Sequence, residues 1–204
     1  MPTGSTEAPP AADELAGTAS PAEVLFRELA AKLSASRPPE HLAALDKAYA
    51  FAASVHASQR RESGEPYIVH PLHTARILAD LNMDLVSLQT GLLHDVVEDT
   101  GVTLAELRRL FGAEVARCVD GVTKLGKLKF YSREEHQAES VRKMLLAMVD
   151  DVRVVIVKLA DRLHNIRTLA FLKDPERRRR VAQETLEIYA PIAHRLGMGR
   201  IRGE

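Results

Sequence analysis

The sequence has few of the residues that build covalent or aromatic sites. It contains 1 cysteine in 204 residues, no tryptophan and 4% aromatic residues. A single cysteine excludes an intrachain disulfide and fits a reducing compartment, so we expect a cytoplasmic protein. Cys118 lies among Val115, Val119 and Val122, which favours a packed thiol over a reactive one. The scarcity of aromatic residues predicts a core of aliphatic side chains packed between helices.

Charge of one sign is not in excess either. The chain has 28 basic and 28 acidic residues and a formal net charge of +0, so it has no overall field that would attract nucleic acids or membranes. No apolar run approaches the length of a bilayer span, and no secretory signal opens the chain. We therefore expect no nucleic-acid or membrane partner for this domain. An anionic ligand would have to be held by local charges and a metal.

The chain is organised as one helical domain after a tail. Residues 1–20 are rich in Ala, Pro, Thr, Ser and Gly and lack amphipathic periodicity, which predicts disorder. Apolar residues then recur at helical spacing throughout 21–198, which predicts an all-α domain. Helices are expected at Ala22 to Ala35, at Leu42 to Val55, from Pro71 to about Leu81, from an Asp84 cap through Leu92 and the residues after it, from capping boxes at Thr103/Glu106 and Ser132/Glu135, through Val152 to Val157, and from Asp174, with a break or kink at Pro191.

The most informative stretch is His94-Asp95-Val96-Val97-Glu98-Asp99. On a helix, residues four apart share a face, so His94 would align with Glu98 and Asp95 with Asp99. A neutral imidazole and an ionised carboxylate are both suitable ligands for Mn, Fe or Zn. The run therefore predicts part of a hydrolytic metal site, although two ligands are too few to complete one.

Asp161 is a candidate for a further ligand. Val154 and Val157 precede it by seven and four residues, so on a helix all three share one apolar face. A carboxylate on that face would be buried, and a buried charge needs a cation, a metal or several hydrogen bonds. Asn165 and Thr168 follow on the same face, so the face becomes polar and could line a pocket.

His70 is the second candidate. Pro66 and Pro71 bracket a short extended piece, and Pro71 is well placed as the first residue of a helix. His70 would then sit at a rigid junction between loop and helix, which suits a metal ligand. Taken alone, a capping or packing role is the commoner one for such a histidine.

Together, the four candidate ligands resemble the ligand pattern of the HD superfamily of metal-dependent phosphohydrolases. They are His70, His94, Asp95 and Asp161. Five segments in order are also similar to the N-terminal hydrolase domain of the RelA/SpoT homologue (Rel) family, namely 61–71, 94–100, 120–125, 158–169 and 190–198. The similarity runs from about Leu42 to the end of the chain. It implies an HD-superfamily helical bundle of about eight to ten helices around a metal site.

The resemblance also implies an activity. Domains of this kind hydrolyse the 3′-pyrophosphate of (p)ppGpp, the alarmone of the stringent response, to GDP or GTP and pyrophosphate. One Mn²⁺ ion, held by the four residues of the ligand pattern, would neutralise phosphate charge and lower the pKa of a bound water. Glu98 and Asp99 would orient or deprotonate that water. Alone, the pair would be read as an acidic helix end.

The same resemblance implies four substrate-binding residues. Arg61 would stack on the guanine or contact phosphate, Ser63 would shape the nucleotide loop, and Asn165 and Thr168 would contact the ribose and phosphates. One residue departs from the family pattern, because many members have Lys where this chain has Glu62. A glutamate facing the pocket would weaken the attraction for phosphate. Arg60, Lys158, Arg162, Arg167 and the other six histidines are expected to be surface, capping or packing groups, with His56 and His164 the least certain.

Two other functions remain open at this stage. A broader HD nucleotide phosphohydrolase would share the ligands but is not expected to share the Arg61 loop or the pair Asn165 and Thr168. A catalytically silent alarmone-binding module would keep the fold and lose turnover, which the intact ligands and the Glu98-Asp99 pair argue against. Because a synthetase domain follows the hydrolase domain in such families, residues 199–204 are expected to begin a linker toward a synthetase domain.

Overall fold

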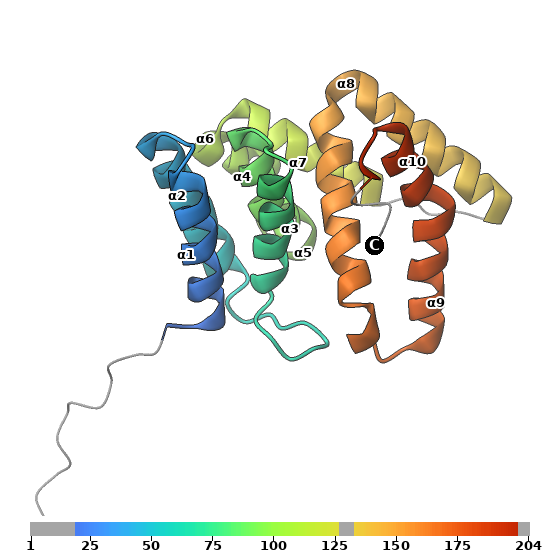
Figure 1. Cartoon of the computed structure of the whole chain (residues 1–204), viewed down its shortest axis with the longest axis horizontal. Coiled ribbons are helices and arrows are strands. Elements are labelled where there is room, and N and C mark those ends of the chain that lie inside the picture. The colour runs from blue at the N-terminus through green and yellow to red at the C-terminus, as the bar shows by residue number, and fades with distance from the viewer. Residues whose placement is uncertain (1–18, 127–132, 200–204) are drawn as a thin grey trace, which may run out of the picture.

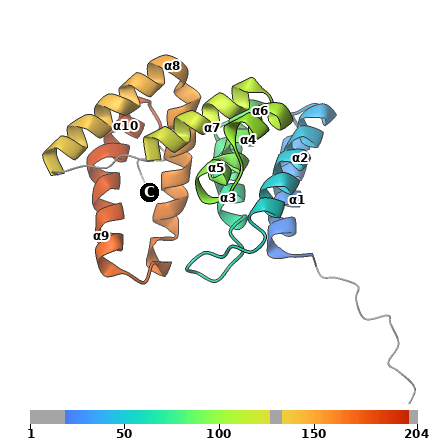
Figure 2. The same ribbon diagram turned by 180° about the vertical axis from the view of Figure 1, so that it is seen from behind.

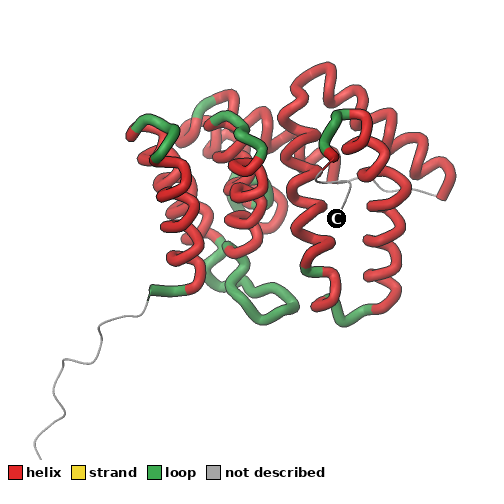
Figure 3. Tube along the Cα trace, in the orientation of Figure 1, coloured by secondary structure: helices red, strands yellow, loops and turns green. Residues whose placement is uncertain are grey.

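The computed structural model describes residues 19–126 and 133–199. Within these residues the chain forms α-helices, a 3-10 turn, a π-helical turn and loops, and its only strand-like pairing is one bridge between Arg60 and Pro66 (Figure 3). The predicted all-α fold of eight to ten helices is thereby confirmed. The elements are α1 Pro21–Ser34, α2 Pro39–Val55, α3 Val69–Asp80, α4 Leu85–Leu93, α5 Val96–Asp99, α6 Leu104–Phe111, α7 Ala113–Gly126, α8 Arg133–Arg167, η1 Leu169–Phe171, α9 Pro175–Glu184, η2 Thr185–Tyr189 and α10 Ala190–Arg195.

The structure describes only small parts of the predicted tail and of the predicted linker. Most of the predicted tail, 1–18, and most of the predicted linker, 200–204, lie outside the described residues. The first helix starts at Pro21, where Ser20 and Glu23 form a reciprocal capping box. None of the described helices is long and apolar enough to cross a membrane.

Helices α3 and α4 form the centre of the bundle. Five of their leucines are almost completely buried, namely Leu72, Leu78, Leu88, Leu92 and Leu93. Helices α1 and α2 pack on one side of this pair, and α7 and α8 pack on the other (Figures 1 and 2). The core is therefore largely aliphatic, as the composition predicts, and buried Cys118 belongs to it.

Gly91 allows α4 to lie close to α3. A Cβ built at Gly91 would lie 2.6 Å from Cδ1 of Leu78 and 3.4 Å from the backbone of Ala75. Any larger side chain would push the two central helices apart or force Leu78 into a new rotamer. The spacing of the central pair therefore depends on a residue without a side chain.

The prediction that one helix carries His94 and Asp95 is wrong. Asp84 does cap α4, since its carboxylate accepts a hydrogen bond from the Ser87 amide at 2.8 Å. The helix then ends at Leu93, and His94 and Asp95 form a turn before the single-turn helix α5. The physical reason is that Nδ1 of His94 bonds the Gly91 carbonyl at 2.9 Å, so a side chain satisfies one of the last carbonyls of the helix.

Helix α8 is two helices joined at a kink. Asp151 has an extended backbone (φ −162°, ψ 109°), and its carboxylate accepts a hydrogen bond from the Arg153 amide at 3.0 Å. The Arg153 guanidinium also reaches Asp84 at 2.9 Å and Glu114 at 2.7 Å. The predicted helix through Val152 to Val157 is confirmed. These ion pairs join the start of this helix to the N-cap of α4 and to the first turn of α7.

Side-chain caps mark two other predicted helix starts, at Thr103 and at Asp174. Thr103 accepts a bond from the Glu106 amide at 3.2 Å, and Asp174 accepts one from the Glu176 amide at 2.9 Å. Pro191 follows the π-helical turn η2 and lies in the first turn of α10, as expected of a residue that cannot donate a helical hydrogen bond. The expected cap at Ser132 lies outside the described residues.

We expect Gly91→Ala to destabilise the fold by about 1–3 kcal/mol, because the added methyl group overpacks the contact between α3 and α4. Urea unfolding of the variant and of the parent chain measures this difference. Gly101→Ala is the matched control, since a Cβ at Gly101 would meet nothing within 4 Å. Equal stability of the two variants would refute the close-packing role of Gly91.

Candidate active site

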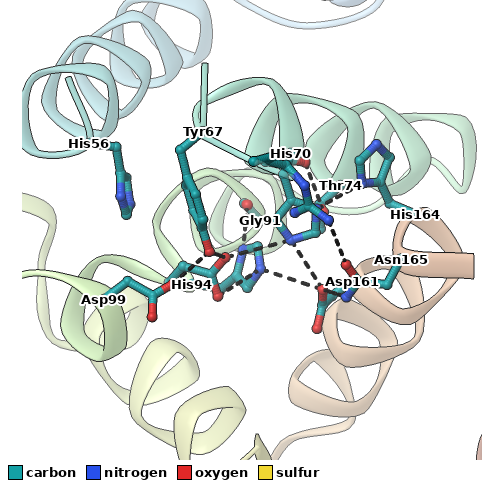
Figure 4. Close-up of polar contacts among 12 residues, drawn as sticks. His56, Tyr67, His70, Thr74, Gly91, His94, Asp99, Asp161, His164 and Asn165 are labelled. Atoms are coloured by element: carbon teal, nitrogen blue, oxygen red, sulfur yellow. Dashed lines mark hydrogen bonds and ion pairs between the residues drawn. The ribbon is translucent and has the colours of Figure 1, made fainter. Parts of the chain in front are cut away.

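The four expected metal ligands come from three parts of the fold. His70 lies in the first turn of α3, His94 and Asp95 form the turn between α4 and α5, and Asp161 lies in the second half of α8. Figure 4 shows that the side chains of His70, His94 and Asp161 point toward one another. These three are buried, and ligand atoms of all three lie within 4.8 Å of one another.

Asp95 completes this ligand cluster, which we define as His70, His94, Asp95 and Asp161. Oδ1 of Asp95 lies 3.2 Å from Nε2 of His94, and Oδ2 lies 3.6 Å from Nε2 of His70. Asp161 Oδ1 lies 3.2 Å from Nε2 of His70 and 3.9 Å from Nε2 of His94. Each carboxylate therefore faces both imidazoles.

The His94 ring indicates which ligand the cluster fits. Because Nδ1 of His94 bonds the Gly91 carbonyl, Nδ1 must carry the hydrogen and Nε2 of the neutral ring has a lone pair. Nε2 is buried and makes no hydrogen bond. A buried lone pair that faces a carboxylate oxygen at 3.2 Å is repelled unless a positive charge lies between them. These donor atoms therefore fit a divalent cation.

His164 lies behind His70 and determines its tautomer. The two Nδ1 atoms are 2.7 Å apart. Burial, with His70 and His73 nearby, lowers the pKa of His164 to about 2, and burial also lowers the pKa of His70. Both rings are therefore neutral near pH 7, and one hydrogen lies between them. When His70 is the donor, its Nε2 presents a lone pair to the cluster.

The Asp161 carboxylate is held as an anion inside the protein. Burial opposes its ionisation, but the Lys158 ammonium holds the pKa of Asp161 well below its usual range. Nζ of Lys158 lies 2.8 Å from Oδ2, and the Asn165 amide donates to Oδ1 at 2.6 Å. The predicted burial of Asp161 behind Val154 and Val157 is confirmed.

Lys158 was expected to be only a surface or structural cation, and the structure places it beside the cluster. A Cβ built at Gly126 would lie 3.5 Å from Oε2 of Glu98 and 3.6 Å from Nζ of Lys158. The ammonium therefore lies close to both the Asp161 carboxylate and the wall formed by Glu98. The spacing of three residues from Asp161 was a sequence signal for this position, because it puts both side chains on one helical face.

A single cavity of about 440 Å³ joins the predicted residues. Nine of the ten predicted site residues line it, and only His94 does not. Glu98 and Asp99 form part of its wall at the end of α5, beside the cluster. The structure thus brings together residues that lie as far apart in sequence as Arg61 and Thr168.

A short hairpin, residues 59–67, forms one side of the cavity. The Tyr67 amide donates to the Gln59 carbonyl at 3.1 Å, and the Arg61 amide donates to the Glu65 carbonyl at 3.0 Å. Gly64 makes the turn with φ +90°, which a residue with a side chain rarely adopts. The hairpin projects from the lower edge of the bundle toward the lower ends of α8 and α9 (Figure 1).

Arg61 of this hairpin reaches the ligand cluster through Asn165. Its Nη2 donates to Asn165 Oδ1 at 3.1 Å, and Asn165 donates in turn to Asp161. Thr168 lies one turn further and donates to the His164 carbonyl at 3.0 Å, so its hydroxyl has lone pairs left for a ligand. Ser63 lines the cavity at the tip of the hairpin.

Tyr67 is a site residue that the sequence interpretation missed. Its hydroxyl lies 2.8 Å from Asp95 Oδ2 and 2.5 Å from Asp99 Oδ2. Burial and these two carboxylates raise the pKa of Tyr67, so the phenol stays protonated and donates to one carboxylate at a time. It connects an expected ligand with an expected catalytic residue.

Two residues hold Tyr67 and Asp99 from behind. The His56 ring stacks on Tyr67 with centroids 4.6 Å apart, and its Nδ1 lies 2.7 Å from Gln59 Oε1. The Gln59 amide donates to the Asp99 carbonyl at 2.8 Å. His56, which was expected to be a packing or capping group, is therefore part of the support for the acidic end of α5.

The chain is similar to a known family and to known proteins. Residues 48–199 match the family model of the HD domain. The chain is 51% identical over 180 residues to the "Bifunctional (p)ppGpp synthase/hydrolase SpoT" of Escherichia coli, covering 88% of this chain and 26% of that protein. It is 57% identical over 161 residues to the "Guanosine-3′,5′-bis(diphosphate) 3′-pyrophosphohydrolase" of Vibrio cholerae, covering 79% of this chain and 23% of that protein.

A solved structure is also similar. It is described as "A metazoan ortholog of SpoT hydrolyzes ppGpp and plays a role in starvation responses", with a TM-score of 0.57 and 31% identity, and the match covers 71% of this chain and 81% of that one. The chain spans about a quarter of the length of the curated relatives described above. It belongs to the HD-domain family, and within that family to the N-terminal HD domains of the RelA/SpoT homologues.

Proposed function

We propose that this chain hydrolyses the 3′-pyrophosphate of (p)ppGpp, releasing pyrophosphate and GDP or GTP. The observation that carries the proposal is the hydrogen-bonded series from Arg61 through Asn165 to Asp161, which joins the hairpin to the ligand cluster inside one cavity. A broader HD phosphohydrolase would need only the cluster. The printed names of the relatives, which describe (p)ppGpp hydrolysis, support the narrower substrate.

The ligand cluster is proposed to hold one Mn²⁺ ion. Two imidazole nitrogens and two carboxylates suit a divalent ion between hard and soft, and Mn²⁺ is our choice among Mn²⁺, Fe²⁺ and Zn²⁺. When bound, such an ion supplies positive charge to the phosphates and makes water more acidic. The chain itself keeps the donors ready, because Gly91 and His164 orient the two rings.

Glu98 and Asp99 are proposed to act on the attacking water. Both carboxylates line the cavity next to the cluster, where either could accept a proton from a water that attacks phosphorus in line. Tyr67 and Gln59 hold the side chain and the backbone of Asp99. Arg61, Ser63, Asn165 and Thr168 are proposed to bind the nucleotide.

Several expectations about the whole protein remain proposals. The relative from Escherichia coli is named as a synthase and a hydrolase, and we propose that a synthetase domain accompanies this chain after residues 199–204 in the full-length protein. The domain bounds 21–198, the cytoplasmic location and the absence of a nucleic-acid partner remain predictions.

Incubation of the purified chain with Mn²⁺ and ppGpp should release GDP and pyrophosphate, measured by anion-exchange chromatography. Chelation and Asp161→Ala should each abolish the reaction, since both would remove the cation. Release of single orthophosphates would instead support a broader nucleotidase. Retained ppGpp binding without turnover would indicate a silent alarmone-binding module.

Replacing the acidic pair should separate chemistry from metal binding. Glu98→Gln and Asp99→Asn should each lower kcat by about 10²–10⁴-fold, the usual contribution of a general base, while calorimetry still detects Mn²⁺ binding. Turnover at the parent rate by a metal-loaded chain with both residues changed to Ala would overturn their assignment to the water.

Tyr67→Phe tests whether Tyr67 positions the acidic residues. The variant keeps the stacking on His56 and loses the hydroxyl. Because hydrogen bonds to charged groups contribute about 1.5–3 kcal/mol, we expect kcat to fall by roughly 10- to 100-fold and Mn²⁺ affinity to weaken. Tyr49→Phe is the control, because Tyr49 stacks on Phe26 with centroids 4.2 Å apart, away from the cavity. Identical kinetics for the two variants would contradict the role of Tyr67.

A further inference from the structure

Glu62, the hairpin residue that departs from the family pattern, pairs with a cation of helix α9. Its Oε1 lies 2.6 Å from Nη1 of Arg177, in the first turn of α9, and its Oε2 accepts a hydrogen bond from the Lys173 amide at 2.9 Å. Glu62 and Arg177 both line the cavity. We name this contact the rim pair, because the two side chains keep 35% and 51% of their surface exposed.

The rim pair lies on the exposed side of the cavity, whereas the ligand cluster lies on its buried side. Asp161 is 5% exposed, and from it the contacts run through Asn165 to Arg61, which is followed in the chain by Glu62. A substrate whose reacting diphosphate lies at the buried cluster would therefore extend its other phosphate group toward this rim. (p)ppGpp carries such a second group, which is a chain of two or three negatively charged phosphates.

The Arg177 side chain is suited to bind this second phosphate group. The Glu62 carboxylate competes with the phosphate for the same guanidinium. A guanidinium binds phosphate through two parallel hydrogen bonds. The exposed pair with Glu62 contributes little free energy in water, so phosphate can displace the carboxylate. Arg178 to Arg180 are also exposed but do not line the cavity. Arg177 is therefore the one arginine of the run 177–180 that lines the cavity.

We propose that Arg177 binds the phosphate group of (p)ppGpp distant from the reacting diphosphate, and that Glu62 lowers substrate affinity by holding Arg177 through the rim pair. The inference rests on the proposed function and adds a specificity determinant to it. A purely structural strap between hairpin and helix is the competing explanation. The two explanations predict KM changes of opposite sign for Glu62→Gln.

Steady-state hydrolysis of ppGpp by the manganese-loaded chain tests the proposal. Glu62→Gln should lower KM by a few fold, roughly fivefold at most for an exposed pair, and Arg177→Gln should raise KM by at least as much. In the Arg177→Gln background, Glu62→Gln should have no further effect. For a strap, both single substitutions would loosen the hairpin and raise KM together.

Two controls separate competition from general charge. Arg178→Gln removes a neighbouring cation that does not line the cavity, and Glu65→Gln removes the same charge from the same hairpin outside the cavity. Both should leave KM unchanged. A KM shift in the same direction for Glu62→Gln and Arg177→Gln, no shift in either, or a persistent effect of Glu62→Gln without Arg177 would overturn the proposal.

Failure of the proposed function is distinguishable from failure of this inference. If the parent chain does not hydrolyse ppGpp, the same variants are compared by calorimetric binding of ppGpp, where the dissociation constant should change with the same signs. Opposite shifts there support the rim pair even without turnover. Absence of both turnover and binding would overturn both proposals.

Discussion

The burial of the Asp161 carboxylate is the constraint on which the rest of the site depends. An ionised carboxylate inside a helical core is costly unless it is paired and hydrogen-bonded, and removing one partner of such a group costs about 3–5 kcal/mol. Lys158 and Asn165 of α8 itself provide two partners, and a cation shared with His70 of α3, whose Nε2 lies 3.2 Å from Oδ1, would provide the third. The stabilisation of this one charge therefore requires α3 and α8 to lie side by side, and it fixes the position of the cavity between them.

Much of this could be predicted from the sequence, because the signals were local. The apolar face of Val154 and Val157 predicted the burial of Asp161, and the proline after His70 predicted its place at a helix start. Fold class followed from helical periodicity and from the resemblance, and the structure and the matching HD-domain model confirm it. Nine of the ten predicted site residues line one cavity, which supports their roles, and the roles of all ten remain proposals.

The parts that the sequence did not reveal depend on contacts between distant segments. Tyr67 meets Asp95 and Asp99 across 28 and 32 residues, and Glu62 meets Arg177 across 115, so no periodicity could indicate either contact. The end of α4 was missed for another reason. A side-chain nitrogen of His94 replaced a backbone donor to the Gly91 carbonyl, and helical spacing alone does not register such competition.

The contact between His70 and His164 sets a requirement at a position that does not line the cavity. For His70 to turn a lone pair toward the cluster, the side chain at 164 has to accept a hydrogen from Nδ1 of His70. A residue of similar volume that could only donate would reverse the ring's polarity and direct a hydrogen at Asp161. What is demanded of position 164 is thus the direction of one hydrogen bond, so a substitution that preserves packing can still change the chemistry of the site.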